Sequence, residues 1–155
     1  MYDHILDLLP YKSSFRFVDE ITSLDENSVT GNYTLKKDSF FYEDHFPGNP
    51  VTPGVIITEI MAQIGLVVLG IYLISDKEKI SPGSDNTLPL LTSAEISFYK
   101  MVLPGEKVTV ISKKQYFRFN KLKCYIEMMN ESGELVANGK FSGIMKQLFL
   151  KQAHL

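Results

Sequence analysis

The stretch PGVIITEIMAQIGLVVLGIYLI, residues 53–74, decides the fold of this 155-residue chain. Apolar residues fill most positions from Val55 to Ile74, and Pro53 and Gly54 stand where a helix would begin. A helix that is apolar on almost all sides has to be covered on all sides, either by lipid or by protein. The two strongly polar side chains in the stretch are Glu59 and Gln63.

These two polar residues distinguish a membrane span from a core helix. The stretch is about 30 Å long if helical, which is roughly the thickness of a bilayer core. Glu59 and Gln63 interrupt its first half, however, and the uninterrupted apolar part, residues 64–74, is too short to span. We therefore expect no membrane insertion and a helix buried by the rest of the protein.

The length, net charge and cysteine content of the chain favour one cytoplasmic domain, residues 1–155. The length is about that of a single domain with one core. The net charge of -2 gives no global field for nucleic acid or for an anionic membrane. The single cysteine, Cys124, fits a reducing compartment, and the N-terminus lacks the pattern of a signal peptide.

Alternating patterns predict strands on both sides of the helix. Two precede it and about four follow it: residues 15–21, 28–35, 89–99, 107–117, 122–130 and 134–145. A polar surface loop, residues 75–87, ends the helix. This order predicts an α+β fold in which a curved antiparallel sheet wraps around one long central helix. The edge strands of such a sheet make dimerisation an expectation.

The start of the helix has the residues of an anion site. Thr52 is a suitable N-cap, Pro53 suits the first helical position, and Gly54 and Val55 would present free backbone N–H groups. Those groups lie at the positive end of the helix dipole, which stabilises an oxyanion. Gly54 has no side chain, so a ligand atom can approach them closely.

Glu59 and Gln63 are four residues apart, so they share one face of the helix. Burial disfavours the ionised form of a carboxyl group, and Glu59 could therefore serve as an acid. The alternative is a structural carboxylate that pairs with a lysine or arginine or reaches solvent. His45, in the loop before the helix, could likewise be a hydrogen-bonded structural histidine.

The segment HFPGNPVTPGV, residues 45–55, resembles the HFPGxPVxPGV signature of the 3-hydroxyacyl-[acyl carrier protein] dehydratases, which have the hot dog fold. The family's catalytic glutamate follows the histidine by fourteen residues, which is the position of Glu59. The resemblance continues through Ala62-Gln63, the segment SFYKMVLPGEKVTV at 97–110 and GELVA at 133–137. It covers most of the chain.

This resemblance implies dehydration of a (3R)-3-hydroxyacyl group on acyl carrier protein to the trans-2-enoyl form. His45 would be the base, Glu59 the acid and Gly54 the backbone donor to the thioester carbonyl, with Val55, Gln63 and Phe46 also binding substrate. No metal and no cofactor are implied, because the substrate is carried on the phosphopantetheine of the carrier protein. The family's site lies between two chains, which implies a homodimer, with a trimer of dimers left open.

Some features depart from the family pattern. The family segment LPHRxPFLLVD is LPYKSSFRFVD here, residues 9–19. The product could therefore belong to fatty acid synthesis or to a related polyene or polyketide-like pathway. A thioesterase and a non-catalytic acyl-binding subunit on the same fold remain alternatives. Glu59 and Val55 stand where the branch that also isomerises has aspartate and cysteine, which favours dehydration alone.

Five basic residues lie within eleven positions that contain no acid: Lys113, Lys114, Arg118, Lys121 and Lys123. We call this set the basic hairpin. It could attract an acidic carrier protein or a phosphopantetheine phosphate. A solvated strand face is the simpler interpretation.

Overall fold

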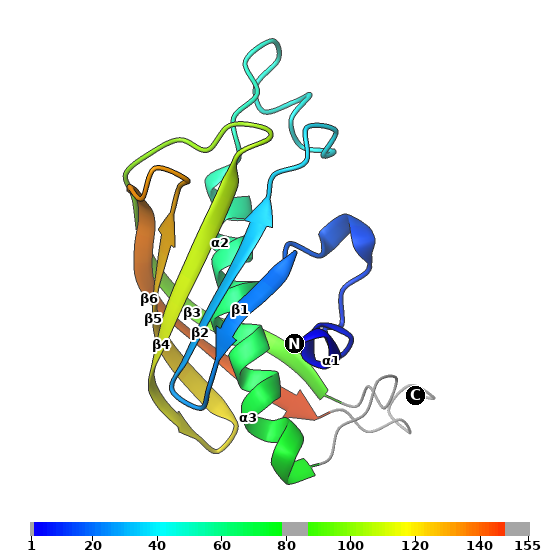
Figure 1. Ribbon diagram of the computed structural model, residues 1–155, viewed down its shortest axis with the longest axis vertical. Helices are drawn as coiled ribbons and strands as arrows, with labels where there is room; N and C mark the ends of the chain where they lie inside the picture. Colours follow the sequence, from blue (N-terminus) through cyan, green and yellow to red (C-terminus); the bar gives the residue numbers. More distant parts are fainter. Residues whose placement is uncertain (1, 79–86, 148–155) are drawn as a thin grey trace.

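A six-stranded antiparallel sheet curves around one long helix in the computed structural model, which describes residues 2–78 and 87–147 (Figure 1). The strand order is β1-β2-β4-β5-β6-β3. The strands are β1 Glu20–Leu24, β2 Ser28–Thr34, β3 Thr87–Phe98, β4 Lys107–Arg118, β5 Lys121–Met129 and β6 Leu135–Gln147. The predicted α+β architecture of the hot dog fold is confirmed.

Three consecutive segments form the central helix: α2 Gly54–Ala62, the π-helical turn η2 Gln63–Val67 and α3 Val68–Glu78. Ile60, Ile64 and Leu69 are fully buried against the sheet and the N-terminal segment. Residues 54–75 are long and apolar enough to cross a membrane, but the fold buries 78% of their most apolar window. This burial is what the sequence predicts for a core helix.

Two short helical elements precede the sheet, α1 Asp3–Leu6 and the 3-10 turn η1 Ser13–Phe15. The predicted strand 15–21 is therefore wrong over residues 15–19, because β1 begins only at Glu20. The backbone N–H of Phe17 and the backbone carbonyl of Phe15 bond to the side chain of Gln63. Groups that pair with the helix in this way are not available for a strand ladder.

The π-helical turn lies where the helix approaches the sheet most closely. A β-carbon at Gly65 would be 2.6 Å from Cδ1 of Ile126 on β5, so only glycine fits without movement. The Ser112 hydroxyl on β4 donates a hydrogen bond of 2.7 Å to the Gly65 carbonyl. Single π-helical turns are frequent at functional sites, and this one begins at Gln63.

The predicted N-cap is also wrong. The structure places Pro53 at the N-cap of α2, and no side chain caps it. The Thr52 hydroxyl instead pairs with the Tyr42 hydroxyl inside the protein. The predicted loop at residues 75–87 is wrong at both ends, because α3 continues to Glu78 and β3 begins at Thr87; residues 79–86 lie outside the described residues.

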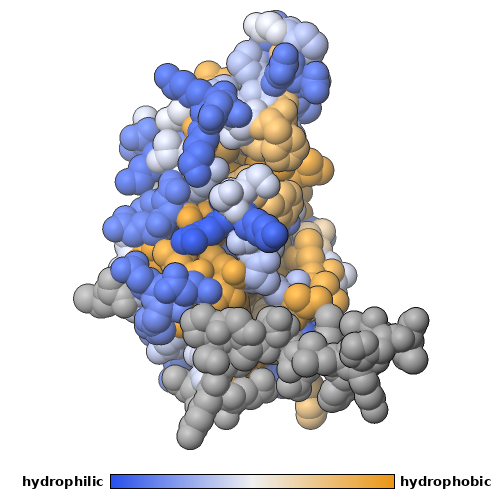
Figure 2. Space-filling view, turned by 90° about the vertical axis from the view of Figure 1, so that its right-hand side faces the viewer, coloured by the Kyte–Doolittle hydropathy of each residue, from blue (hydrophilic) through white to orange (hydrophobic). Residues whose placement is uncertain are grey.

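The strands β1 and β3 form the two edges of the sheet. Large apolar side chains are exposed along β3 and the segment that follows it: Leu90, Leu91, Phe98, Tyr99, Met101 and Leu103. Apolar surface is also visible between polar residues on the side of the molecule shown in Figure 2. Exposed apolar surface of this kind marks a binding interface.

Candidate active site

Glu59 lies on α2 and lines a cavity between the central helix and the sheet. The cavity has a volume of about 150 Å³. Its lining residues are Tyr11, Glu59, Ala62, Leu66, Val67, Pro89, Leu90, Leu91 and Met145. A dry cavity of this size holds about six carbon atoms. The cavity of a single chain therefore has room for a short acyl segment.

Gln63 holds Glu59 in place. Its Nε2 donates to Oε2 of Glu59 at 2.8 Å and to the carbonyl of Phe15 at 2.9 Å. Its Oε1 accepts from the backbone N–H of Phe17 at 2.8 Å. The N–H of Phe17 needs an acceptor and the carbonyl of Phe15 needs a donor, so these partners fix which way the amide points. Its NH₂ group is therefore the one that faces Glu59.

This contact determines which oxygen of Glu59 carries a proton. Oε2 accepts from an NH₂ group, so in the neutral acid the proton belongs on Oε1. Burial raises the pKa of Glu59, and the hydrogen bond from Gln63 opposes that rise only in part. Glu59 is thus a half-buried carboxyl group that is oriented by its neighbour, with a raised pKa that suits a proton donor.

Gln63 itself is fully buried and does not line the cavity. Both N–H groups of its amide are used inside the protein. Sequence reasoning assigned it to substrate binding, but its contacts assign it to the positioning of Glu59.

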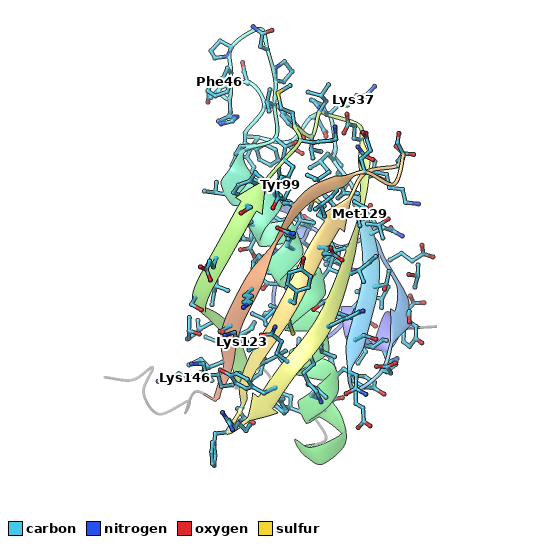
Figure 3. All side chains as sticks on the ribbon, turned by 90° about the vertical axis from the view of Figure 1, so that its left-hand side faces the viewer. Lys37, Phe46, Tyr99, Lys123, Met129 and Lys146 are labelled. Carbon is cyan, nitrogen blue, oxygen red and sulfur yellow. The ribbon has the colours of Figure 1, made fainter. Side chains whose placement is uncertain are left out.

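His45 lies in the loop between β2 and α2, which extends beyond the end of the sheet; Figure 3 labels its neighbour Phe46 there. Nδ1 of His45 is 2.8 Å from the carbonyl of Val51. A carbonyl only accepts, so Nδ1 carries the proton in the neutral ring and Nε2 has a free lone pair. The ring stacks on Phe46 with centroids 4.1 Å apart. Nε2 is therefore prepared to accept a proton.

The start of α2 is accessible, as the sequence predicts. The first amides to bond within the helix belong to Ile56 and Ile57, and both donate to the Pro53 carbonyl. The amides of Gly54 and Val55 precede them, and both residues are exposed. The Phe98 ring lies in front of Gly54, 3.5 Å from the position a β-carbon would take. A ligand that reaches these amides would pass Phe98.

The structure of one chain does not bring all the predicted residues together. It joins Glu59 with Gln63 and His45 with Phe46, but His45 does not line the Glu59 cavity. Tyr11 does line it, and sequence reasoning did not assign Tyr11 to the site. Its only sequence signal is the altered segment at residues 9–19.

The described residues contain no group of three or more His, Cys, Asp or Glu side chains arranged to hold a metal ion. The thiol of Cys124 is buried, and burial raises its pKa to about 11, which keeps it protonated.

The model of the FabA-like domain matches residues 9–141. The chain belongs to this family. It is 34% identical to the 3-hydroxyacyl-[acyl-carrier-protein] dehydratase FabZ of Caldicellulosiruptor saccharolyticus over 148 residues, which cover 90% of this chain and 96% of that protein. It is 32% identical to the dehydratase of the same name from Rickettsia bellii, over 92% of this chain and 93% of that protein.

Solved structures confirm the fold of this FabA-like chain. The dehydratase heterocomplex ApeI:P from Xenorhabdus doucetiae matches with a TM-score of 0.74 at 13% identity, over 97% of this chain and 94% of that one. A hypothetical thioesterase from Streptococcus pneumoniae, solved with coenzyme A, matches with a TM-score of 0.58 at 13% identity, over 83% and 86%. At these identities the likeness concerns the fold alone.

The raised pKa of Glu59 predicts how its replacement alters stability. The folded pKa lies above the unfolded one, so the stability that Glu59 contributes is present at low pH and is lost as the pH rises through the folded pKa. Glu59→Gln has no ionisable carboxyl group at this position, so it does not lose this stability as the pH rises. In urea unfolding, the free energy of unfolding of Glu59→Gln should increase relative to the unmodified protein between about pH 4 and pH 8.

Glu134→Gln is the matched control. Hydrogen bonds from Asn130 and Lys100 lower the pKa of this exposed carboxyl group, so its replacement should change relative stability in the opposite direction, and only below about pH 4.3. A relative stability of Glu59→Gln that is constant with pH would contradict a raised pKa for Glu59.

Proposed function

We propose that this chain dehydrates (3R)-3-hydroxyacyl groups on acyl carrier protein to trans-2-enoyl groups, in fatty acid or related acyl-chain biosynthesis. The observation that carries the proposal is Glu59, a half-buried acid whose proton belongs on Oε1 because Gln63 occupies Oε2. The two relatives named as FabZ dehydratases, each about as long as this chain, support the same reaction.

The reaction follows from the roles of three groups. Nε2 of His45 takes a proton from C2 of the substrate, and negative charge develops on the thioester oxygen. The free amides of Gly54 and Val55 stabilise that charge at the start of α2. Oε1 of Glu59 gives its proton to the 3-hydroxyl as the C3–O bond breaks, and water leaves. The proton on His45 then passes to solvent and Glu59 regains one, so no cofactor enters the proposal.

The site is proposed to form between two chains. The loop of His45 extends away from the sheet, and the Glu59 cavity of the same chain does not include His45. A twofold axis beside β3 pairs this edge strand with β3 of a second copy in antiparallel fashion. This pairing covers the exposed apolar side chains of β3. Such pairing inverts one chain relative to the other, so the loop of one chain approaches the body of its partner.

Mixing of two inactive variants tests this shared site. His45→Ala removes the base and Glu59→Gln removes the acid, so each variant alone should lose activity by orders of magnitude. A mixed dimer has one site with both groups intact. Equal mixtures, allowed to exchange subunits, should recover about a quarter of the unmodified activity. No recovery in a mixture whose mixed dimers are detected by mass spectrometry would contradict a shared site.

The basic hairpin is the proposed contact for the acidic carrier protein. The segment 107–147 has eight lysine and arginine residues against three glutamates, in a chain whose net charge is -2. Among the described residues, Lys100 and Glu134 form the one ion pair within 4 Å. No carboxylate in that part of the chain therefore pairs with the basic hairpin. Figure 3 shows Lys123 near the end of the sheet opposite Phe46. A cytoplasmic location, where such carriers act, is part of the proposal.

Charge reversal tests the carrier contact. Lys121→Glu with Lys123→Glu should raise KM for a carrier-bound substrate about tenfold or more, because repulsion replaces attraction. KM for the same acyl group on N-acetylcysteamine should stay unchanged. Lys36→Glu with Lys107→Glu, which makes the same charge change at the other end of the sheet, is the control. Equal effects of the two double variants would contradict a specific contact.

Product analysis tests the reaction itself. The purified chain, given a 3-hydroxyacyl carrier protein, should produce the absorbance of a conjugated enoyl thioester and release no free thiol. Free thiol without enoyl absorbance would establish the thioesterase alternative instead. If turnover appeared only after addition of a second hot dog subunit, the chain would be part of a heterocomplex.

A further inference from the structure

Tyr11 is the second polar side chain in the Glu59 cavity. Of the nine lining residues, seven have apolar side chains, and the other two are Glu59 and Tyr11. Tyr11 comes from the loop between α1 and η1, and its ring contacts Phe15 with centroids 6.3 Å apart. The Phe15 carbonyl is bonded to Gln63, which in turn holds Glu59. The contacts that fix the acid thus also place Tyr11.

Within the described residues, three tyrosine hydroxyls bond to a side chain, and that of Tyr11 is not among them. The hydroxyls of Tyr42, Tyr99 and Tyr125 each bond to a neighbouring side chain. Among the described residues, none hydrogen-bonds with the Tyr11 hydroxyl. Tyr11 is half-buried and lines the cavity where the substrate would lie, so its hydroxyl group is accessible to a ligand there.

The protonation state of Tyr11 suits a donor. Burial, and next the charge of nearby Glu59, raise the pKa of Tyr11 above its ordinary value. The phenol therefore keeps its proton wherever the enzyme is folded and active. It can donate a hydrogen bond, but it does not exchange its proton with the substrate.

The departing oxygen of the substrate is the atom that requires such a donor. As the C3–O bond lengthens, negative charge develops on this oxygen, and one proton from Glu59 occupies only one of its lone pairs. The apolar wall supplies no second side-chain donor. We propose that the Tyr11 hydroxyl donates a hydrogen bond to the 3-oxygen of the substrate and, together with Glu59, holds that oxygen as it leaves.

This inference rests on the proposed dehydration and makes it more specific. The electrons of the C3–O bond go to the oxygen, Oε1 of Glu59 supplies the proton that completes water, and Tyr11 retains its own proton throughout. Because the hydrogen bond strengthens as charge develops, Tyr11 acts mainly on the transition state.

Tyr11→Phe tests this role, since it removes one oxygen atom and keeps the ring that contacts Phe15. With a 3-hydroxyacyl thioester, kcat should fall on the order of 10- to 100-fold while KM changes by less than about threefold. The pH dependence of kcat/KM should stay unchanged, because Tyr11 does not titrate in this range. Tyr72→Phe, which removes a hydroxyl on α3 outside the cavity, is the matched control and should behave as the unmodified protein.

A second substrate separates this role from a structural one. A 3-chloroacyl thioester eliminates chloride, which leaves without a proton and accepts only weak hydrogen bonds. Its elimination should be nearly the same in Tyr11→Phe and in the unmodified protein, after correction for the spontaneous rate. Equal losses with both substrates, or unchanged kinetics with the hydroxyacyl substrate, would overturn the role of Tyr11 while the dehydration stands. No dehydration by the unmodified protein would overturn both.

Discussion

The site depends on the hydrogen bonds of one buried amide, that of Gln63. It joins the N-terminal segment to the central helix through Phe15 and Phe17, and with its remaining N–H it holds Glu59. The two backbone partners permit one orientation of the amide, and that orientation decides that Oε2 of Glu59 accepts a hydrogen bond and Oε1 is left to carry the proton. A change in the N-terminal segment would therefore alter the acid without touching it.

The fold keeps this amide in position by close packing. Gly65 lets the helix approach β5, and the Ser112 hydroxyl satisfies the carbonyl at the π-helical turn that begins at Gln63. The apolar helix and the sheet that surrounds it form one core, which also supplies the mostly apolar walls of the cavity. Partial burial against these walls raises the pKa of Glu59, and a low local dielectric strengthens any hydrogen bond made to the departing oxygen.

Much of this arrangement could be predicted from the sequence. The helix is evident because residues 55–74 are almost continuously apolar, and β4 and β5 are evident because their side chains alternate. The spacing of Glu59 and Gln63 gives their common face of the helix. These features are local, so a sequence pattern contains them.

Other features depend on contacts between distant segments. The first strand starts later than its alternation indicates because Gln63, more than forty residues away, takes the backbone groups of Phe15 and Phe17. The place of Tyr11 beside Glu59 and the tautomer of His45 likewise depend on tertiary packing. The contacts of Gln63 also depend on distant segments. Its polar side chain suggests a substrate contact until its buried partners are known.

The central claim is that Glu59 is a half-buried acid with a raised pKa, whose oxygen not bonded to Gln63 carries the proton. The most direct measurement is a carbon-13 NMR titration of the Glu59 carboxyl group in the folded protein, assigned by its loss in Glu59→Gln. The account predicts a midpoint above the ordinary glutamate value of about 4.3. A midpoint at or below that value would show a stabilised carboxylate and would contradict the account.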